Sequence, residues 1–268
     1  MVSVIIPTYN RAHLIERAIK SVLNQTYKEF ELIIVDDAST DNTEEVVKKF
    51  KDERIRYIKC EENGGAAKAR NCGIREAKYD YIAFQDSDDE WHADKLEKQM
   101  KVMLEAPEEV GLVYCEYFYH GLRGNERCFP DKAIPLEMKE GYIFPRLLQG
   151  NLIGTPTMLV KKECFEKLGA FSEGLECFED WELALRIARN YKIAFVPECL
   201  MEVYATWQSV TNNVEGFLKV KCILAGAYKT ELIEYGLFNE VVGGIIEKGK
   251  ELGYLATVVE YLEAVMSK

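Results

Sequence analysis

Short apolar runs alternate with amphipathic segments along the first third of the chain. Runs rich in β-branched residues predict four strands, at 2–6, 31–35, 55–59 and 81–84. Between these runs, 12–24 and 43–50 place their apolar residues on one helical face. Near-continuous apolar strands that alternate with amphipathic helices are typical of a largely parallel sheet covered on both faces. The pattern predicts an α/β fold with a Rossmann-like, mostly parallel central sheet.

The pattern changes after residue 110. Further strands are predicted at 112–120, 158–160, 193–196 and 200–204, and a helix at 178–190. After Ser209 the composition is helical, with an apolar stripe formed by Leu252, Leu255, Val259, Leu262 and Met266. Such a stripe predicts a helix that packs on the domain or on a second subunit, which would make a homodimer. We therefore expect two halves of one domain, 1–110 and 111–214, and a C-terminal helical extension, 215–268.

Composition narrows the class of protein. The net charge of −11 argues against a protein that neutralises a nucleic-acid backbone. Eight cysteines are scattered without a CxxC motif or a Cys/His cluster, so we expect free thiols and no zinc site. The start of the chain lacks the pattern of a signal peptide, and no apolar run approaches the roughly 20 residues that a transmembrane helix needs. These features predict a soluble cytoplasmic protein, with peripheral membrane contact as its only membrane association.

Polar side chains follow three of the predicted strands. The segments are 7–10, 36–37 and 86–89. In open α/β sheets the ligand crevice lies beyond the carboxyl ends of the strands. We expect these three clusters, two of them acidic, to converge on one edge of the sheet.

The most acidic cluster contains Asp86, Asp88 and Asp89. Like charges at this spacing repel each other unless a cation or strong hydrogen bonds neutralise them. Oxygen ligands with no nearby Cys or His suit Mg²⁺ or Mn²⁺. The alternative is an acidic turn that caps a helix starting near Trp91, because Asp is a favoured N-cap residue. Taken by itself, the motif favours the helix cap.

Three other features could carry chemistry. A glycine turn at 64–65 leads into a helix that bears Arg70, an arrangement that favours anions, although the Walker lysine-serine pattern is absent. Glu179 and Asp180 begin a helix, where they are either stabilised by its dipole or include a general base. His120 ends a tyrosine-rich strand and could contact an acceptor, but a structural role is the stronger interpretation.

Five segments, taken together, resemble the family 2 glycosyltransferases of the GT-A fold. In chain order they are 4–11, 35–41, 69–73, 86–91 and 179–181, and segment 165–171 is similar as well. The resemblance covers about residues 1–210 and leaves the tail unexplained. It implies a hexosyltransferase-type enzyme that inverts the anomeric carbon. Its substrates would be a nucleotide-sugar donor, with UDP as the expected nucleotide, and a saccharide or lipid-linked saccharide acceptor, with Mn²⁺ or Mg²⁺ as the cofactor.

The resemblance also implies roles for single residues. Residues 1–110 would bind the donor, through Pro7, Thr8, Tyr9, Asn10, Arg11, Asp37, Arg70, Asn71 and Asp86. Asp88 would bind the metal, with Asp86 beside it or on the ribose. Residues 111–214 would hold the acceptor and the base, Asp180, with Glu179 next to it. Trp181 would pack near the acceptor. From their place in a tyrosine-rich predicted strand, Tyr117 and Tyr119 are further acceptor-side candidates that could stack on a sugar, and a core position in that strand is the equal alternative.

One position departs from the family pattern. Family members often carry a histidine shortly after the last strand, where this chain has Trp207, so water or Gln208 would complete the metal shell. Two alternative functions stay open. A sugar-nucleotide nucleotidyltransferase would need a glycine-rich basic loop where 7–10 stands. A non-catalytic nucleotide-sugar binding module would have no use for a carboxylate at Asp180.

Overall fold

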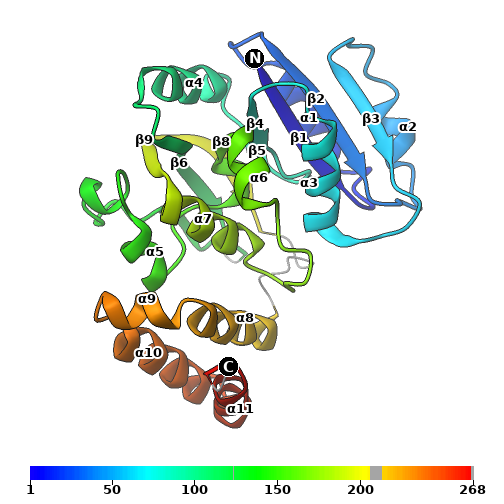
Figure 1. Cartoon of the computed structure of the whole chain (residues 1–268). Coiled ribbons are helices and arrows are strands. Elements are labelled where there is room, and N and C mark those ends of the chain that lie inside the picture. The colour runs from blue at the N-terminus through cyan, green and yellow to red at the C-terminus, as the bar shows by residue number, and fades with distance from the viewer. Residues whose placement is uncertain (123, 206–212, 267–268) are drawn as a thin grey trace.

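The computed structural model describes residues 1–122, 124–205 and 213–266. These residues form a central mixed sheet, helices on both of its faces, and a separate layer of C-terminal helices (Figure 1). The strand order is β3-β2-β1-β4-β8-β6-β9-β5, and β7 pairs with β6 off this path. The architecture confirms the predicted α/β fold with a C-terminal helical tail.

The first half of the sheet is parallel. Its strands are β1 (Val2–Thr8), β2 (Phe30–Asp36), β3 (Ile55–Lys59) and β4 (Tyr81–Phe84), with β1 between β2 and β4. Their connections contain α1 (Ile15–Leu23), α2 (Thr43–Val47) and α3 (Gly65–Glu76). Side chains alternate between two apolar clusters: Ile5 packs with α3 on one face, and Val4 and Ile6 pack with α1 and α2 on the other. Because β1 and its neighbours are parallel, their carboxyl ends meet at one edge, as the sequence predicts.

The second half of the sheet mixes directions. Its strands are β5 (Glu90–Trp91), β6 (Val110–His120), β7 (Glu126–Phe129), β8 (Leu159–Lys161) and β9 (Lys192–Tyr204). Its helices are α4 (Lys95–Glu105), η1 (Leu136–Met138), α5 (Phe144–Gln149), η2 (Thr155–Thr157), α6 (Lys162–Leu168) and α7 (Glu179–Asn190). Strand β8 is antiparallel to both β4 and β6, while β9 runs parallel to β6. This short antiparallel strand joins the two halves into one sheet.

Two predicted elements differ from the structure. The strands expected at 193–196 and 200–204 are one strand, β9, whose register against β6 shifts between Val196 and Cys199. Pro197 lies in this bulge, where its missing N–H breaks no ladder bond. The helix expected near Trp91 begins only at Lys95, because Trp91 pairs with Met201 as part of β5.

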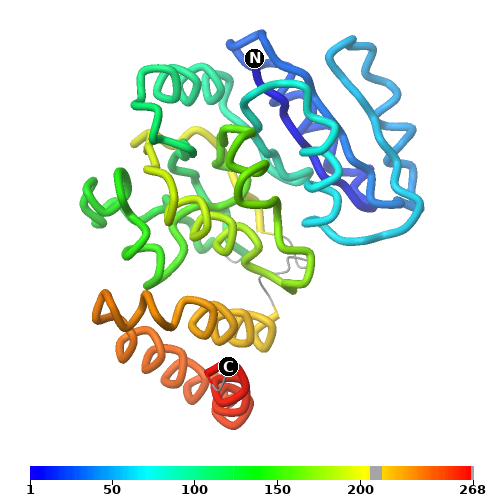
Figure 2. The backbone as a smooth tube through the Cα atoms, viewed as in Figure 1, coloured from blue at the N-terminus to red at the C-terminus, as the bar shows by residue number. Residues whose placement is uncertain are grey.

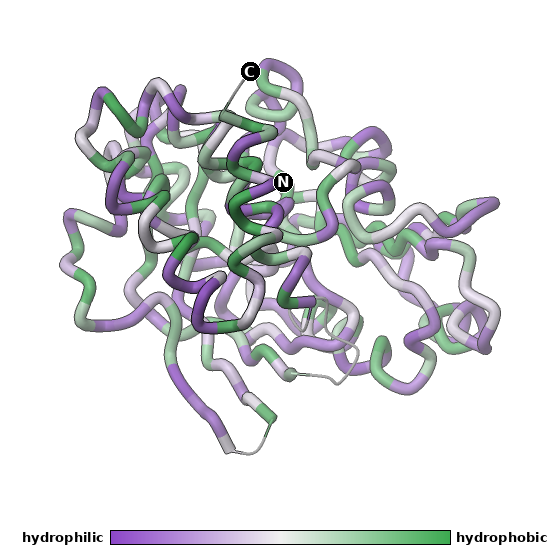
Figure 3. The backbone as a smooth tube through the Cα atoms, turned by 90° about the horizontal axis from the view of Figure 1, so that it is seen from below, coloured by the Kyte–Doolittle hydropathy of each residue, from purple (hydrophilic) through white to green (hydrophobic). Residues whose placement is uncertain are grey.

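The tail consists of α8 (Val214–Ala227), α9 (Lys229–Glu234), α10 (Phe238–Glu251) and α11 (Leu255–Met266). The tail forms the orange-to-red layer beneath α5 and α7 (Figures 1 and 2). Coloured by hydropathy, the backbone alternates between hydrophobic and hydrophilic residues (Figure 3). The helical prediction is confirmed, but the predicted stripe is wrong in part. Gly253, at φ +82°, separates α10 from α11. Within α11, Leu262 of the stripe is buried together with Val258, whereas Leu255 and Val259 are exposed. No helix in the described segments is long and apolar enough to span a bilayer.

Candidate active site

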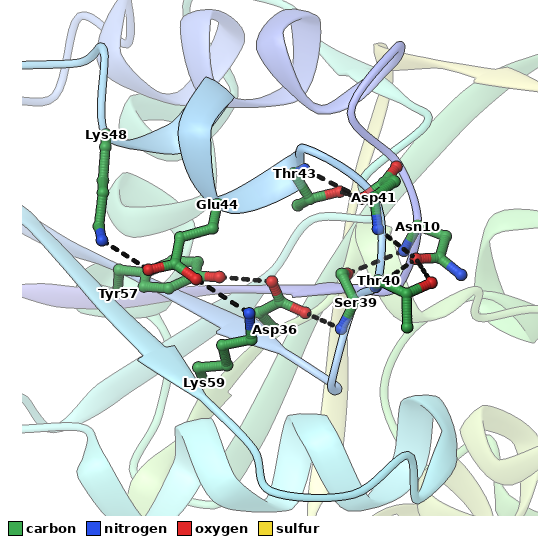
Figure 4. A network of polar contacts seen from close by, with 10 residues as sticks. All are labelled: Asn10, Asp36, Ser39, Thr40, Asp41, Thr43, Glu44, Lys48, Tyr57 and Lys59. Carbon is green, nitrogen blue, oxygen red and sulfur yellow. Dashed lines mark hydrogen bonds and ion pairs between the residues drawn. The ribbon is translucent and has the colours of Figure 1, made fainter.

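The loops after β1 and β2 are joined by the side chain of Asn10. Its Oδ1 accepts hydrogen bonds from the backbone N–H of Thr40 (2.8 Å) and of Asp41 (3.3 Å), and its own N–H donates to Ser39 Oγ (2.9 Å) (Figure 4). Ser39 N–H in turn donates to Oδ1 of the buried Asp36 (2.7 Å). The two loops therefore form one hydrogen-bonded unit beside Tyr9, a residue that is 43% exposed.

The buried Asp37 connects this unit to α3. Its carboxylate accepts hydrogen bonds from the backbone N–H of Gly64 (2.9 Å) and of Gly65 (2.7 Å). Gly65 has a φ of +86°, a conformation that glycine adopts without strain. The glycine turn that the sequence singles out is thus bound to a strand-end aspartate.

Arg70 links the two halves of the domain. It lies on α3, is only 5% exposed, and donates from Nη2 to Asp86 Oδ1 and from Nη1 to Glu179 Oε1, both at 2.8 Å. Its Nε has no hydrogen-bond partner within the described residues. Glu179 is 109 positions away in the sequence. One guanidinium therefore positions the acidic cluster after β4 against the start of α7.

The acidic cluster holds charges that repel each other. Burial and the charge of Asp86 raise the pKa of Asp88, and burial with the Asp86 and Asp88 charges raises the pKa of Asp89 well above its usual range. Asp89 Oδ1 accepts a hydrogen bond from Tyr204 N–H (3.0 Å). The N-cap of α4 is Asp94, so Asp86 and Asp88 cap no helix. The helix-cap alternative is therefore wrong.

Asp180 lies in the first turn of α7. Burial and the Glu179 charge raise the pKa of Asp180 to about 7, against the opposing effect of Arg70. Its Oδ1 accepts a hydrogen bond from Trp181 N–H (2.6 Å). The charge of Asp180 contributes, after burial, to raising the pKa of Tyr117, so the two side chains lie within electrostatic reach. A carboxylate with a pKa near 7 has the property that a general base needs at neutral pH.

Three non-glycine residues around this edge adopt left-handed backbone conformations. Asn10 follows β1 (φ +52°), Ala38 follows β2 (φ +65°), and Phe178 precedes α7 (φ +59°). Such conformations cost roughly 1–2 kcal/mol for residues other than glycine and concentrate at functional sites. The sequence gives no signal for Ala38 or Phe178, because neither residue favours this conformation.

The family model described as glycosyl transferase family 2 matches residues 3–168, more than half of the chain. The chain belongs to glycosyltransferase family 2. As a member of this family, it is a glycosyltransferase, and the resemblance read from its five motifs is confirmed.

Relatives of this family 2 glycosyltransferase include a putative teichuronic acid biosynthesis glycosyltransferase, TuaG, from Bacillus subtilis. The two are 39% identical over 218 residues, which cover 80% of this chain and 82% of TuaG. The chain spans only 32% of the length of two rickettsial relatives that it also matches.

Two solved structures share the fold of this family 2 glycosyltransferase. One is S. aureus TarS in complex with UDP-GlcNAc, with a TM-score of 0.69 and 18% identity over 99% of this chain and 90% of that chain. The other is the mannosyltransferase PcManGT from Pyrobaculum calidifontis in complex with GDP-Man and Mn²⁺, with a TM-score of 0.65 and 20% identity over 99% and 75%. At these identities the likeness supports the fold, which is GT-A.

Several predicted site residues of this glycosyltransferase have internal partners. Asn71 joins α3 to the segment before α7: its Nδ2 donates to Phe171 O and Glu173 Oε1, and its Oδ1 accepts from Phe171 N–H, all at 2.9 Å. Trp181 is buried and donates from Nε1 to Leu147 O (2.7 Å), which is a packing role. Tyr119 lies beneath the guanidinium of Arg127. Trp207 and Gln208 lie outside the described residues.

Some side chains near the predicted site have unpaired polar atoms, and others make contacts that the sequence does not predict. Pro7 and Thr8 end β1, and the buried hydroxyl of Thr8 has no partner among the described residues. Gln85, directly after β4, is also buried with both ends of its amide unpaired there. Arg17, which the sequence does not single out, donates to the Asp88 carbonyl and lies 3.9 Å from the ring centroid of Tyr204. The Arg17 contact depends on a fold that brings α1 to the end of β9.

Two of the three histidines, His92 and His120, form a structural cluster. Each carboxylate oxygen of Glu202 forms a hydrogen bond with one histidine: Oε1 with His92 Nε2 (2.7 Å) and Oε2 with His120 Nε2 (2.6 Å). His120 also stacks on Tyr204, with ring centroids 4.7 Å apart. In the described part of the chain no group of three or more His, Cys, Asp or Glu side chains has a geometry ready to hold a metal. His120 is therefore engaged in bracing β6 against β9.

Proposed function

We infer that this glycosyltransferase moves a sugar, with inversion, from a UDP-sugar to a hydroxyl of a saccharide or lipid-linked saccharide. The observation that carries this proposal is the Arg70 bridge, which ties the strand-end carboxylate Asp86 to the helix-start pair Glu179 and Asp180. This bridge supports a single site, in which one side binds the donor and the other side carries the general base. The base side has a carboxylate with a pKa of about 7.

Asp180 is the proposed general base. With a pKa of about 7, roughly half of its population is ionised at neutral pH and ready to take a proton from an acceptor hydroxyl. The hydroxyl oxygen then attacks the anomeric carbon from the face opposite the departing nucleoside diphosphate, and the configuration inverts. Glu179, held by Arg70, keeps the position of Asp180 fixed through the first turn of α7. The scheme needs no carboxylate nucleophile at the sugar.

The chemistry of the acidic cluster fits a divalent metal ion. Repulsion between Asp86, Asp88 and Asp89 raises two of their pKa values, and a hard cation would relieve it. Asp88 would be the protein ligand, with Asp86 partly committed to Arg70. Mn²⁺ or Mg²⁺ bound there would neutralise charge on the nucleoside diphosphate. The Mn²⁺ in the PcManGT complex supports this assignment.

The donor side is proposed to be residues 1–110. The exposed ring of Tyr9 would stack on the base, while Thr8, Arg11 and Asp37 lie in or beside the same loops. The complex of TarS with UDP-GlcNAc supports a UDP-sugar donor. The assignment of TuaG to teichuronic acid biosynthesis supports an acceptor on a growing polysaccharide.

A panel of nucleotide sugars tests this proposal. With Mn²⁺ present, a donor at 100 times its Kd should stabilise the folded state by about 2.7 kcal/mol in thermal unfolding. The same donor should release its nucleoside diphosphate when acceptor saccharides are added. Stabilisation without release across a broad acceptor panel would favour the binding module, and release of pyrophosphate would favour the nucleotidyltransferase.

A further inference from the structure

A second cavity lies between the catalytic domain and the tail, away from the acidic cluster. Its volume is about 390 Å³, within the range of small-molecule sites. Helices α5 and α7 form one wall, and α8 and α10 form the other, where the tail lies beneath the domain in Figure 1. Trp181, one residue after the proposed base, belongs to the first wall.

Most of the cavity wall is apolar. Its main apolar side chains are Leu148, Trp181, Leu185, Phe217, Leu224 and Ile245. Phe217 also packs on Phe178, with ring centroids 5.1 Å apart, and Phe178 packs on Trp181 at 5.4 Å. A wall of this kind favours binding of a hydrocarbon chain, because binding removes the apolar surfaces of both the wall and the chain from water. The same aromatic contacts join the cavity to the start of α7.

Two lysines lie in this apolar wall. The ammonium of Lys221 is 4.8 Å from the ring centroid of Phe217 and has no ion pair with any described residue. Burial and the like charge of Lys248 lower the pKa of Lys221. Among the residues that the structure describes, Lys248 pairs with the exposed Glu251 (2.8 Å). Lys221 is half-buried, and a half-buried ammonium without a carboxylate partner favours an anionic ligand.

One carboxylate also lines the cavity. Glu240 accepts a hydrogen bond from Gln149 Nε2 (3.2 Å) and makes no ion pair with Lys221 or Lys248 within the described residues. The lining therefore carries two positive charges and one negative charge. This imbalance and the apolar wall together describe a ligand with an anionic end and a hydrocarbon end.

We propose that this cavity binds a single-chain amphiphile with an anionic phosphate head, its hydrocarbon chain against Trp181 and Phe217 and its head group at Lys221 and Lys248. The tail supports this ligand class in a second way. More than half of the large apolar side chains that are exposed in the described residues lie on or beside its helices, among them Ile233, Ile246 and Leu255. A ligand in the cavity would lie in the same layer of helices as these exposed apolar side chains. The site is separate from glycosyl transfer and goes beyond it.

Two adjacent glycines of α10 provide matched variants. Gly244 lines the cavity and Gly243 does not. A Cβ placed on either residue meets no atom within 4 Å, so both positions leave room where a leucine side chain would begin. Leucine also forms helices better than glycine, so both variants should fold at least as well as the wild type. Gly244→Leu fills the cavity, and Gly243→Leu adds the same side chain outside it.

The lysines provide a second matched pair on α8. Lys221→Met keeps the apolar stem and removes the charge in the cavity. Lys219→Met removes a charge two residues away, where Lys219 pairs with Glu176 (2.6 Å) outside the cavity. The probes are dodecyl phosphate, dodecyl maltoside and inorganic phosphate, each below its critical micelle concentration where it has one. Calorimetry on the full chain, without nucleotide sugar or metal, measures binding independently of transfer.

Dodecyl phosphate should bind the wild type, Gly243→Leu and Lys219→Met with similar affinity. Gly244→Leu and Lys221→Met should each weaken it at least tenfold. Dodecyl maltoside and inorganic phosphate should bind at least tenfold more weakly than dodecyl phosphate, because each lacks one half of the ligand. Equal binding to Gly244→Leu, equal binding of maltoside or inorganic phosphate, or no binding of dodecyl phosphate to the wild type would each overturn the proposal.

Discussion

Replacing Arg70 with methionine removes the guanidinium that joins Asp86 to Glu179. The two carboxylates, with side chains 27% and 20% exposed, would then face a buried site without their cation. Removing one partner of a buried ion pair costs roughly 3–5 kcal/mol. Because these carboxylates are partly solvated, water would screen some of this cost. We expect Arg70→Met to lower the free energy of unfolding by about 2–4 kcal/mol.

The same substitution should change the pH dependence of activity. The charge of Arg70 lowers the pKa of Asp180, which burial and Glu179 raise to about 7. Without this cation the pKa of Asp180 rises further, and a smaller fraction of the base is ionised at neutral pH. The profile of kcat/KM should therefore shift to higher pH, with the largest loss of activity below pH 7 and partial recovery above pH 8.

Denaturant unfolding and nucleoside diphosphate release measure these two effects. Arg186→Met is the matched control, because Arg186 also bridges a carboxylate, Glu182 (2.6 Å), and three backbone carbonyls, and lies away from Asp180. It should cost stability and leave the pH profile unchanged. Adding Glu179→Gln to Arg70→Met should recover part of the lost stability. A loss below 1 kcal/mol for Arg70→Met, or an unshifted profile, would refute this reasoning.

Three further predictions follow from the same contacts. Asp88→Ala should weaken Mn²⁺-dependent binding of UDP in calorimetry, whereas Asp94→Ala, a carboxylate paired with Lys98 at the start of α4, should not; equal affinity in both variants contradicts the metal role. The pKa of Asp180 is raised in the folded state, so ionising this group destabilises the fold as the pH rises from about 4 to about 7. We therefore expect Asp180→Asn to be more stable than the wild type by about 1–3 kcal/mol at pH 8, and equally stable near pH 4. A constant difference across this range would exclude the raised pKa. Asn10→Ala should cost about 2–3 kcal/mol in denaturant unfolding, and Asn10→Gly about 1 kcal/mol less, since glycine accepts the positive φ; equal losses would mean that the backbone conformation contributes nothing.

Local patterns predict the strands and their convergence, because both depend on short-range signals. The alternation of apolar runs and helices places segments 7–10, 36–37 and 86–89 at one edge, and the structure confirms that neighbourhood for β1, β2 and β4. The tail stripe fails in part for a packing reason. Leu255, Val259 and Leu262 share α11, but only Leu262 is buried, because the face that packs on α10 is rotated toward Val258.

Local patterns do not predict contacts between residues that are distant in the sequence. Arg70 is expected at a pyrophosphate, but its pairing with Glu179 depends on how α3 and α7 pack across the sheet. The amide of Asn71 is likewise taken up by Phe171 and Glu173, which only the fold brings close. Left-handed conformations at Ala38 and Phe178 oppose the intrinsic preference of both residues, so tertiary structure imposes them.

Nucleoside diphosphate release by Asp180→Asn tests the central claim most directly. The substitution keeps the size of the side chain and removes its ability to take a proton. With the donor selected by the nucleotide-sugar panel, Asp180→Asn should bind that donor with nearly wild-type affinity in the presence of Mn²⁺. It should lose at least 100-fold in acceptor-dependent release, the loss typical of removing a general base. Release at the wild-type rate with intact donor binding would contradict the assignment of Asp180 as the catalytic base.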